Sequence, residues 1–133
     1  MQSAFREDVE KTDSLVVGLP GPMYAWYLRN TYLENNRCVP NRLTVCGTRV
    51  DLGMIDVPCY VLVTQEDHIV PWKSAYRTTQ LVGGTSQFVL GASGHIAGVI
   101  NPASKNKRNE WIGGTQGDDA ERWLDSAHSV AGS

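Results

Sequence analysis

The sequence predicts an α/β fold built around one parallel strand, helix, strand unit, and three observations lead to this fold class. Val, Tyr and Leu run together without polar interruption over Cys59–Thr64, as in a buried strand. A helical pattern begins at Pro71 and ends before Gly83-Gly84. A second apolar run covers Ser86–Leu90. This order within about 30 residues is typical of a βαβ unit, whose strands are parallel and whose crossover is right-handed.

Length and charge limit the organisation and the partners of the chain. With 133 residues, it is one domain or a part of a larger one. The formal net charge of −2 gives no global field that would draw it to nucleic acid. No apolar run approaches the roughly 18 residues of a membrane-spanning helix, and the first residues lack a secretory profile. We therefore expect a cytoplasmic protein with no membrane span and no nucleic-acid partner.

The first third of the chain contains an arm and a helix. Residues 1–18 are charged and have few apolar anchors, so we expect a loosely ordered arm. Pro22 is well placed as the first residue of a helix that extends to about Asn35. Apolar side chains surround most of this helix: Met23, Tyr24, Trp26, Tyr27, Leu28, Tyr32 and Leu33. The pattern fits a core helix, and it also fits a cap helix over a substrate or a partner.

The next segment predicts a hairpin. The alternating pairs Leu43/Val45 and Val50/Leu52 flank a turn that contains Gly47. The three cysteines of the chain form no Cys-x-x-Cys pair and have no histidine at zinc-finger spacing; they are Cys38, Cys46 and Cys59. Neither a disulfide framework nor a metal site is expected, and we expect the thiols to be small buried hydrophobes.

Beyond the second strand, the sequence predicts short elements and a basic segment. Residues Ile96–Ile100 can form one or two helical turns. The basic cluster of Lys105, Lys107 and Arg108 is more typical of a solvated loop than of an anion site. After a glycine-rich link, Asp118-Asp119 is expected to cap a last amphipathic helix that extends to about Ala127.

Each strand of the βαβ unit is followed by a loop that carries a chemically active side chain. Asp67 follows the first strand, and His95 follows the second, 28 positions later. Because the carboxyl ends of parallel strands meet at one edge of a sheet, we expect the two side chains to lie together. A histidine base needs a carboxylate on its far ring nitrogen, which fixes the tautomer and stabilises the imidazolium. The pair therefore predicts the acid and the base of a triad of α/β-hydrolase type.

Other interpretations of these residues stay open. Alone, Asp67 also fits a turn or helix-capping carboxylate, and His95 also fits a capping or core histidine. Glu66 can compete with Asp67 for the role of the acid. His68 can point into the same cleft or be a neutral loop histidine.

The first member of such a triad is missing from the sequence. The nucleophile should precede both residues on an elbow of Gly-x-Ser-x-Gly type. Cys46 is followed by Gly47, but Thr44 stands where the elbow needs glycine, and Cys59 lies within a predicted strand. We therefore expect this chain to be inactive by itself.

Four segments of the sequence are distinctive: Leu19–Arg29 (LPGPMYAWYLR), Leu43–Gly47 (LTVCG), Glu66–Trp72 (EDHIVPW) and Phe88–Pro102 (FVLGASGHIAGVINP). They closely resemble the carboxyl-terminal third of class I poly(3-hydroxyalkanoate) synthases, and the resemblance covers about Leu19–Ala127. It implies that residues 19–133 are the carboxyl-terminal part of an α/β-hydrolase catalytic domain. In this part, the βαβ unit is accompanied by a cap-like helix and a hairpin, and the sheet is incomplete, with an unpaired edge at Cys59–Thr64.

The resemblance also implies an activity. These synthases are acyltransferases that polymerise (R)-3-hydroxyacyl-CoA, here expected to be 3-hydroxybutyryl-CoA, release CoA and form polyester granules in the cytoplasm. By resemblance, Asp67 is the triad acid, His95 is the base and His68 is the histidine next to the acid. The catalytic cysteine lies upstream, in a region that this chain lacks, so the chain would be a truncated synthase. No cofactor or metal is implied, since the CoA thioester is the substrate.

Some features depart from the family, and other functions stay open. Residues 1–18 differ from the corresponding part of the family. Ala103 replaces an expected proline, and the chain stops before the family's Trp-rich end. The chain can be a non-catalytic relic that binds a full-length synthase or the granule surface through Trp26, Tyr27 and Tyr32. It can also form a homodimer. A weaker alternative is a subdomain of an esterase, because the same acid and base serve esterases.

Overall fold

The computed structural model describes residues 18, 20–96 and 98–132. Contacts within the chain divide it into two units, Met1–Asn36 and Arg37–Ser133, and each is described here by itself. The arm predicted over residues 1–18 lies outside the described residues except for Gly18. No helix in the described part of the chain is long and apolar enough to cross a membrane.

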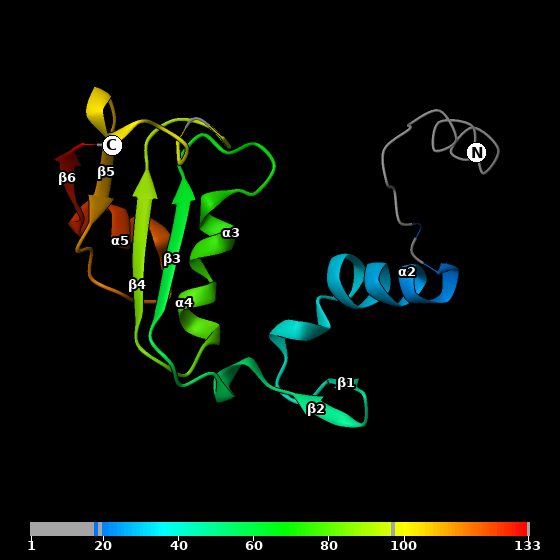
Figure 1. Ribbon diagram of the computed structural model, residues 1–133. Helices are drawn as coiled ribbons and strands as arrows, with labels where there is room; N and C mark the ends of the chain where they lie inside the picture. Colours follow the sequence, from blue (N-terminus) through cyan, green and yellow to red (C-terminus); the bar gives the residue numbers. More distant parts are fainter. Residues whose placement is uncertain (1–17, 19, 97, 133) are drawn as a thin grey trace. The chain divides into compact units, whose positions relative to one another are not determined.

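A four-stranded mixed sheet forms the centre of the second unit, in the order β3-β4-β5-β6 (Figure 1). Its strands are β3 (Cys59–Thr64), β4 (Ser86–Gly91), β5 (Asn109–Ile112) and β6 (His128–Ala131). β3 and β4 are parallel and pair from Cys59↔Ser86 to Thr64↔Gly91, which confirms the predicted βαβ unit. The two antiparallel strands β5 and β6 were not predicted.

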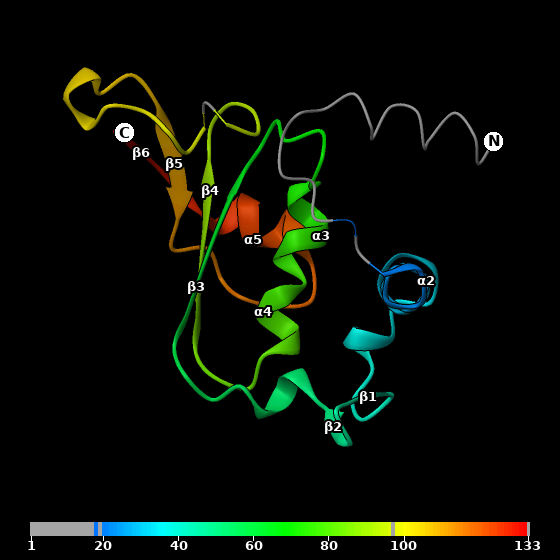
Figure 2. The same ribbon diagram turned by 45° about the vertical axis from the view of Figure 1, so that its right-hand side comes forward.

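The helices of this unit cover one face of the sheet (Figure 2). They are α3 (Trp72–Tyr76), α4 (Thr78–Leu81) and α5 (Ala120–Ser126). Asp119 caps α5, as predicted, by accepting a hydrogen bond from the Glu121 amide. The single helix predicted from Pro71 is interrupted at Arg77. The Thr79 hydroxyl donates to the Tyr76 carbonyl. The backbone amide of Gln80 donates to the Arg77 carbonyl, three residues earlier, and not to the Tyr76 carbonyl, four residues earlier. The regular hydrogen-bond pattern of the α-helix is therefore broken at this point.

Three aromatic side chains join the helices to the sheet. Tyr76, Phe88 and Trp123 are almost completely buried. Phe88 packs edge to face against both others, with ring centroids 4.9 Å from Tyr76 and 4.7 Å from Trp123. Trp72 and Leu90 complete the cluster. On the opposite face of β3, Tyr60 and Leu62 are exposed. The aromatic cluster therefore lies on one side of the sheet. Val89 of β4, which faces the other side, is also buried.

The predicted hairpin is confirmed. It pairs β1 (Leu43–Val45) with β2 (Thr48–Val50), and the two turn residues Cys46 and Gly47 have φ of 49° and 79°. Positive φ at both turn positions is the type I′ geometry that fits the strand twist. The expectation of buried thiols is wrong for Cys46, which is exposed because it occupies this turn; Cys38 and Cys59 are partly buried. Short 3₁₀ turns flank the hairpin at Asn36–Cys38 and Leu52–Met54.

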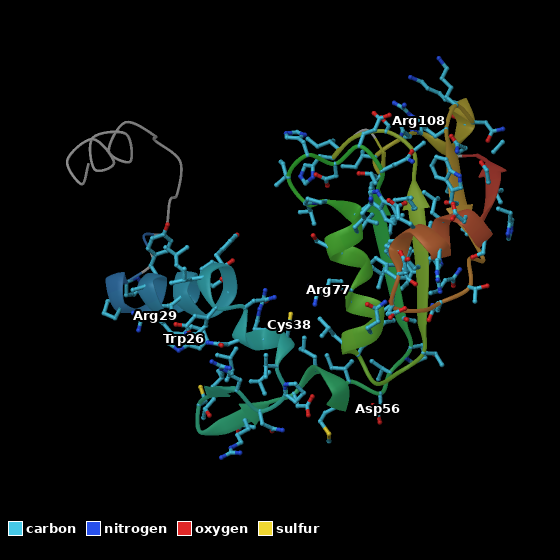
Figure 3. The ribbon with its side chains drawn as sticks, turned by 180° about the vertical axis from the view of Figure 1, so that it is seen from behind. Trp26, Arg29, Cys38, Asp56, Arg77 and Arg108 are labelled. Carbon is cyan, nitrogen blue, oxygen red and sulfur yellow. The ribbon has the colours of Figure 1, made fainter. Side chains whose placement is uncertain are left out.

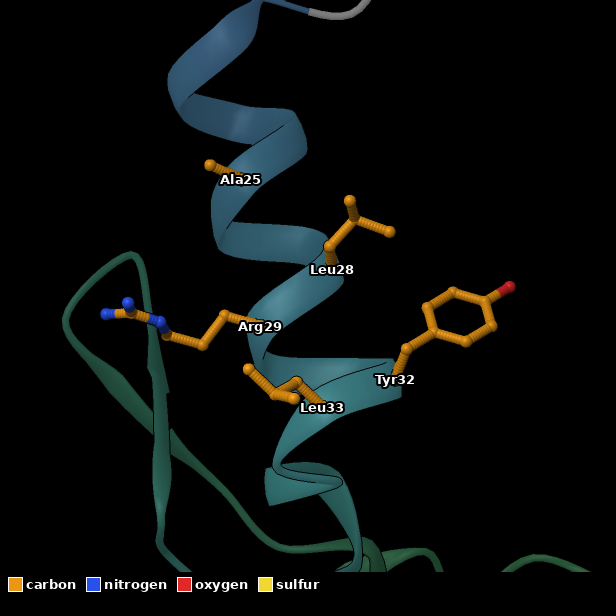
Figure 4. Close-up of a pocket in the computed structure, with 5 residues that line it drawn as sticks. All are labelled: Ala25, Leu28, Arg29, Tyr32 and Leu33. Atoms are coloured by element: carbon orange, nitrogen blue, oxygen red, sulfur yellow. The ribbon is translucent and has the colours of Figure 1, made fainter. Parts of the chain in front are cut away.

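In the first unit, the predicted helix forms over Gly21–Leu28 as α2 and continues through a π-helical turn, Arg29–Leu33. The side chains of Asn30 and Thr31 bond to carbonyls four residues earlier, at Trp26 and Tyr27. Neither helical segment buries a residue. Five side chains around the junction line a shallow hollow of about 460 Å³ (Figure 4): Ala25, Leu28, Arg29, Tyr32 and Leu33. In the described part of the chain, α2 is therefore not a core helix.

Candidate active site

Two loops meet at the carboxyl ends of β3 and β4. The Gln65 amide donates to the Gly91 carbonyl at 2.8 Å, and the Glu66 amide donates to the Ser93 carbonyl at 3.0 Å. These bonds continue the pairing of the two strands beyond their ends. They hold the loop that carries Asp67 beside the loop that carries His95, as the parallel topology predicts.

The backbone of the histidine loop is specialised. Ser93 has φ of 79°, in the left-handed region that non-glycine residues rarely adopt. A Cβ atom at Gly98 would overlap the methyl group of Thr64 and lie 2.8 Å from the Ala92 carbonyl oxygen. Glycine at position 98 thus lets the loop close tightly over the end of β3.

Asp67 is held from two sides. Its Oδ1 accepts hydrogen bonds from the amides of Ile69 at 2.8 Å and Val70 at 3.0 Å. Its Oδ2 lies 2.7 Å from Nδ1 of His95. The bond with His95 is the main reason why the pKa of Asp67 falls from 3.8 to about 2, and the two backbone bonds add to it. The side chain is 10% exposed and carries a negative charge at neutral pH.

The ionised carboxylate determines the tautomer of His95. A carboxylate can only accept hydrogen bonds, so the proton between the two residues belongs to Nδ1 of the imidazole. In the neutral ring, Nε2 then has a free lone pair and can accept a proton. The ring is 42% exposed, which leaves it accessible to a reacting group. The arrangement can therefore carry out general base chemistry at Nε2.

The two neighbours of Asp67 do not take part in this pair. Glu66 and His68 are both exposed, and Asp67 is the carboxylate that binds His95. The competition between Glu66 and Asp67 that the sequence left open is thus decided in favour of Asp67 as the partner of the imidazole. The catalytic role of His68 stays a prediction.

The cysteines raise the question of the nucleophile. Cys59 is the first residue of β3, and Asp67 follows the last. The first and last residues of this strand are roughly 17 Å apart, so Cys59 lies far outside the reach of His95. Cys46 occupies the turn of the hairpin. No group of three or more His, Cys, Asp or Glu side chains suited to a metal ion occurs among the described residues.

The backbone contacts that hold the acid were not predicted from the sequence. The two amides that bind Asp67 belong to residues two and three positions later, as in an Asx turn, and Pro71 follows directly before α3. The sequence does contain a signal for this turn, namely Asp67 followed four residues later by Pro71. The left-handed Ser93 had no comparable signal, because serine has no special preference for that conformation.

The chain is similar in sequence to several curated proteins. No protein-family model matches the chain. The poly(3-hydroxyalkanoate) polymerase subunit PhaC of Cupriavidus necator is 56% identical over 115 residues, which are 86% of this chain and 20% of the relative. The Rhizobium meliloti subunit of the same name is 44% identical over 86% of this chain and 19% of the relative. Poly(3-hydroxyalkanoate) polymerase 1 of Ectopseudomonas oleovorans is 39% identical over 71% of this chain and 17% of the relative. The chain spans about one fifth of the length of these relatives.

Proposed function

Because this chain belongs by sequence to the poly(3-hydroxyalkanoate) polymerase family, we propose that it supplies the acid and the base of a polymerase active site. The observation that carries the proposal is the 2.7 Å contact between Asp67 Oδ2 and His95 Nδ1, made where two parallel strands end. In this proposal, β3, β4 and the helices on their face are one part of an α/β-hydrolase fold. The remaining strands and the nucleophile come from the rest of such a polymerase.

The chemistry follows from the orientation of His95. Nε2 takes the proton of a cysteine thiol, and the thiolate attacks the carbonyl carbon of (R)-3-hydroxyacyl-CoA, for which 3-hydroxybutyryl-CoA is the expected substrate. The bond between the acyl carbon and the CoA sulfur breaks, CoA leaves with the proton held by the imidazolium, and the acyl group remains on the cysteine. The 3-hydroxyl group of another hydroxyacyl unit then gives its proton to Nε2 and attacks the thioester. The bond between the acyl carbon and the cysteine sulfur breaks, an ester bond lengthens the polyester, and the cysteine takes the proton back. Asp67 keeps Nδ1 protonated and stabilises the imidazolium formed in each step.

A chimeric polymerase tests this function. The matched 115 residues of the Cupriavidus necator protein are replaced by those of this chain, and CoA release from 3-hydroxybutyryl-CoA is measured with a thiol reagent. We expect His95→Gln and Asp67→Asn each to lower kcat at least about 100-fold, since general base catalysis contributes roughly 10²–10⁴-fold. The purified 133-residue chain alone is expected to release no CoA.

Neighbouring residues provide matched controls. Glu66→Gln removes an adjacent carboxylate and His68→Gln an adjacent imidazole, without touching the Asp67–His95 bond. We expect Glu66→Gln to leave kcat within about threefold, and His68→Gln to have a smaller effect than His95→Gln. A chimera that stays fully active with His95→Gln contradicts the proposal. CoA release by the isolated chain that His95→Ala abolishes would show that the nucleophile lies within this chain.

A second candidate function is binding without catalysis. The exposed side chains of Trp26, Tyr27 and Tyr32 on the first unit favour it, because large exposed apolar surfaces often mark interaction sites. The chain would then bind a full-length polymerase or the surface of a polyester granule in the cytoplasm. Co-sedimentation of the purified chain with granules, compared with a Trp26→Ser/Tyr32→Ser variant, tests this candidate. If the wild-type chain and the variant sediment equally with the granules, or if neither sediments with them, the result contradicts this candidate function.

A further inference from the structure

Thr64, the last residue of β3, has a buried hydroxyl group that makes no hydrogen bond to any described residue. The residue is 2% exposed. A buried polar group without a partner costs free energy, so the hydroxyl does not stabilise this end of the strand through a bond within the described chain. What Thr64 contributes to its surroundings in this structure is therefore the shape of its branched side chain.

Thr64 faces the side of the sheet opposite the aromatic cluster. Val61 and Val63 of β3 pack against that cluster, and successive side chains of a strand point to opposite faces. In Figure 3 the orange helix α5 lies in front of β4, so this view shows the face with the cluster. On the other face, a Cβ atom at Gly91, the partner of Thr64 in β4, would lie 3.6 Å from the Thr64 methyl carbon.

The loop that carries His95 closes over this end of β3 as a helical turn. The Gly98 amide donates to the Gly94 carbonyl at 3.0 Å. The Ile100 amide donates to the Ile96 carbonyl, also at 3.0 Å, which confirms the predicted helical turn. Each bond joins residues four positions apart, and the first one spans His95. The position of the imidazole is therefore set by the surface on which this turn rests.

The turn rests on the methyl group of Thr64. A Cβ atom added at Gly98 would overlap that methyl carbon, so the turn and the strand approach as closely as glycine allows. The backbone of Thr64 also reaches the acid, because its carbonyl accepts a hydrogen bond from the Asp67 amide at 3.3 Å. One residue thus contacts both loops: its side chain supports the turn of the base, and its carbonyl holds the start of the loop of the acid.

We propose that Thr64 is a positioning residue for the acid and base pair, and that it acts through its methyl group. The methyl group fixes how deeply the turn settles on the end of β3, and so fixes where the imidazole of His95 stands. Without it, the 2.7 Å contact between Nδ1 of His95 and Oδ2 of Asp67 becomes looser. The consequence for catalysis rests on the proposed function, whereas the support of the turn rests on packing alone.

Two substitutions separate the methyl group from the hydroxyl. Thr64→Val keeps a branched side chain of the same shape and removes the unpaired hydroxyl. Thr64→Ser keeps the hydroxyl and removes the methyl group. Replacing a hydroxyl that has no partner with an apolar group is nearly neutral or stabilising. We therefore expect Thr64→Val to keep the contact between Asp67 and His95, and Thr64→Ser to loosen it.

Nuclear magnetic resonance of the full 133-residue chain measures this contact. The proton on Nδ1 of His95 lies in the hydrogen bond to Asp67, so its exchange with water reports how often the bond opens. We expect exchange about tenfold faster in Thr64→Ser, and changed less than about threefold in Thr64→Val. Faster exchange in Thr64→Val than in Thr64→Ser would mean that the hydroxyl matters and would contradict the proposal. Equal exchange in both variants and the wild type would contradict it as well.

A double variant tests the contact between Thr64 and Gly98. Gly98→Ala alone adds a methyl group that overlaps the one on Thr64. In Thr64→Ser/Gly98→Ala the older methyl group is absent, so the double variant should lose less stability than the two single variants together. Urea denaturation of all three variants measures this coupling. Additive losses would mean that the two side chains do not meet, and they would contradict the proposal.

The chimeric polymerase shows the consequence for catalysis. Thr64→Ser should lower kcat about 10- to 100-fold, because a displacement of about 1 Å at a catalytic group can cost about 100-fold. KM should stay within about threefold, since substrate binding does not depend on the imidazole in the proposed chemistry. Thr64→Val, which restores the shape, should restore kcat to within about threefold of the wild type. A general loss of structure would not produce this split between kcat and KM.

The outcomes also separate this proposal from the proposed function. If Thr64→Ser speeds exchange at His95 but the chimera stays active with His95→Gln, the proposed function fails and the positioning of the turn stands. If the chimera depends on His95 but responds alike to Thr64→Ser and Thr64→Val, Thr64 does not position the base, and the proposed function stands.

Discussion

Two segments of this chain are similarly rich in apolar and aromatic residues, yet only one of them builds a core. The helical segment Gly21–Leu33 buries no residue. In the sheet unit, by contrast, Tyr76, Phe88 and Trp123 are each at most 2% exposed. The difference lies in the number of layers, because the sheet has helices against one face, whereas the described residues of the first unit give the helical segment no second layer.

The comparison shows that apolar composition alone does not bury a side chain. Burial requires a second element of secondary structure that faces the first. The Asp67–His95 pair stands at the end of the layered unit, directly above Thr64 and Gly91 of the paired strands. The candidate site is thus supported by the only part of the described chain that has a hydrophobic core.

The largest expected effect distinguishes the two segments directly. Phe88→Ala should lower the free energy of unfolding by about 3–5 kcal/mol, because it opens a cavity between Tyr76 and Trp123. Tyr32→Ala, at a position that is 76% exposed, should change it by less than about 0.5 kcal/mol. Urea denaturation followed by far-ultraviolet circular dichroism measures both. Similar losses in the two variants would mean that the helical segment is buried as well.

A smaller effect tests whether close packing reaches the loop that carries His95. Gly98→Ala should destabilise the chain by about 1–3 kcal/mol, because the added methyl group overlaps Thr64 and the Ala92 carbonyl. Gly94→Ala in the same loop is the control, since its Cβ would meet only the Glu66 carbonyl oxygen at an ordinary 3.7 Å. Thermal unfolding measures both variants. If they unfold alike, the loop is not packed against the end of β3.

The smallest expected effect concerns the dependence of stability on pH. The pKa of Asp67 is about 2 in the folded chain and near its ordinary 3.8 when unfolded, so the unfolded state binds more protons between these values. The stabilisation is therefore complete above about pH 4 and is lost as the pH falls towards 2. Asp67→Asn should remove this stabilisation, so the free energy of unfolding should fall less steeply between about pH 4 and pH 2 than in the wild type.

The control for this prediction is the residue that directly follows the helical segment, Glu34. Glu34→Gln removes a carboxylate that lies 3.8 Å from Arg29 in an exposed ion pair, and the glutamine oxygen can still accept the hydrogen bond from the Asn36 side chain. Such pairs contribute little to stability, so the acid limb should keep the steepness of the wild type. An Asp67→Asn variant that follows the wild-type curve throughout would contradict the tight bond between Asp67 and His95.

Local patterns in the sequence predicted much of the fold. The strands β3 and β4, the hairpin and the capped helix α5 each have a signal within their own residues, such as an apolar run, a glycine turn or an aspartate cap. The strands β5 and β6 have only four residues each and lack a clear alternation. They form because β5 pairs with β4 and β6 pairs with β5. Such pairing between distant segments leaves no mark in a short window of sequence.

The candidate site was predictable to the same extent. The meeting of Asp67 with His95 followed from parallel topology, and the structure brings these two residues together. The packing of Thr64 under the loop that carries His95 could not be predicted, because it depends on the turn that brings Gly98 back over the end of β3. Sequence spacing indicates which elements meet, and the conformation of the loops determines what lies between them.

The turn of the hairpin also has a practical use. Cys46 is the exposed cysteine of the three, and it occupies a two-residue turn with a fixed backbone, while Cys38 and Cys59 are partly buried. A maleimide fluorophore or a nitroxide spin label added in limiting amount should therefore react first at Cys46. The native sequence thus carries its own attachment point for a spectroscopic reporter, and no cysteine needs to be introduced to follow the motions of this hairpin.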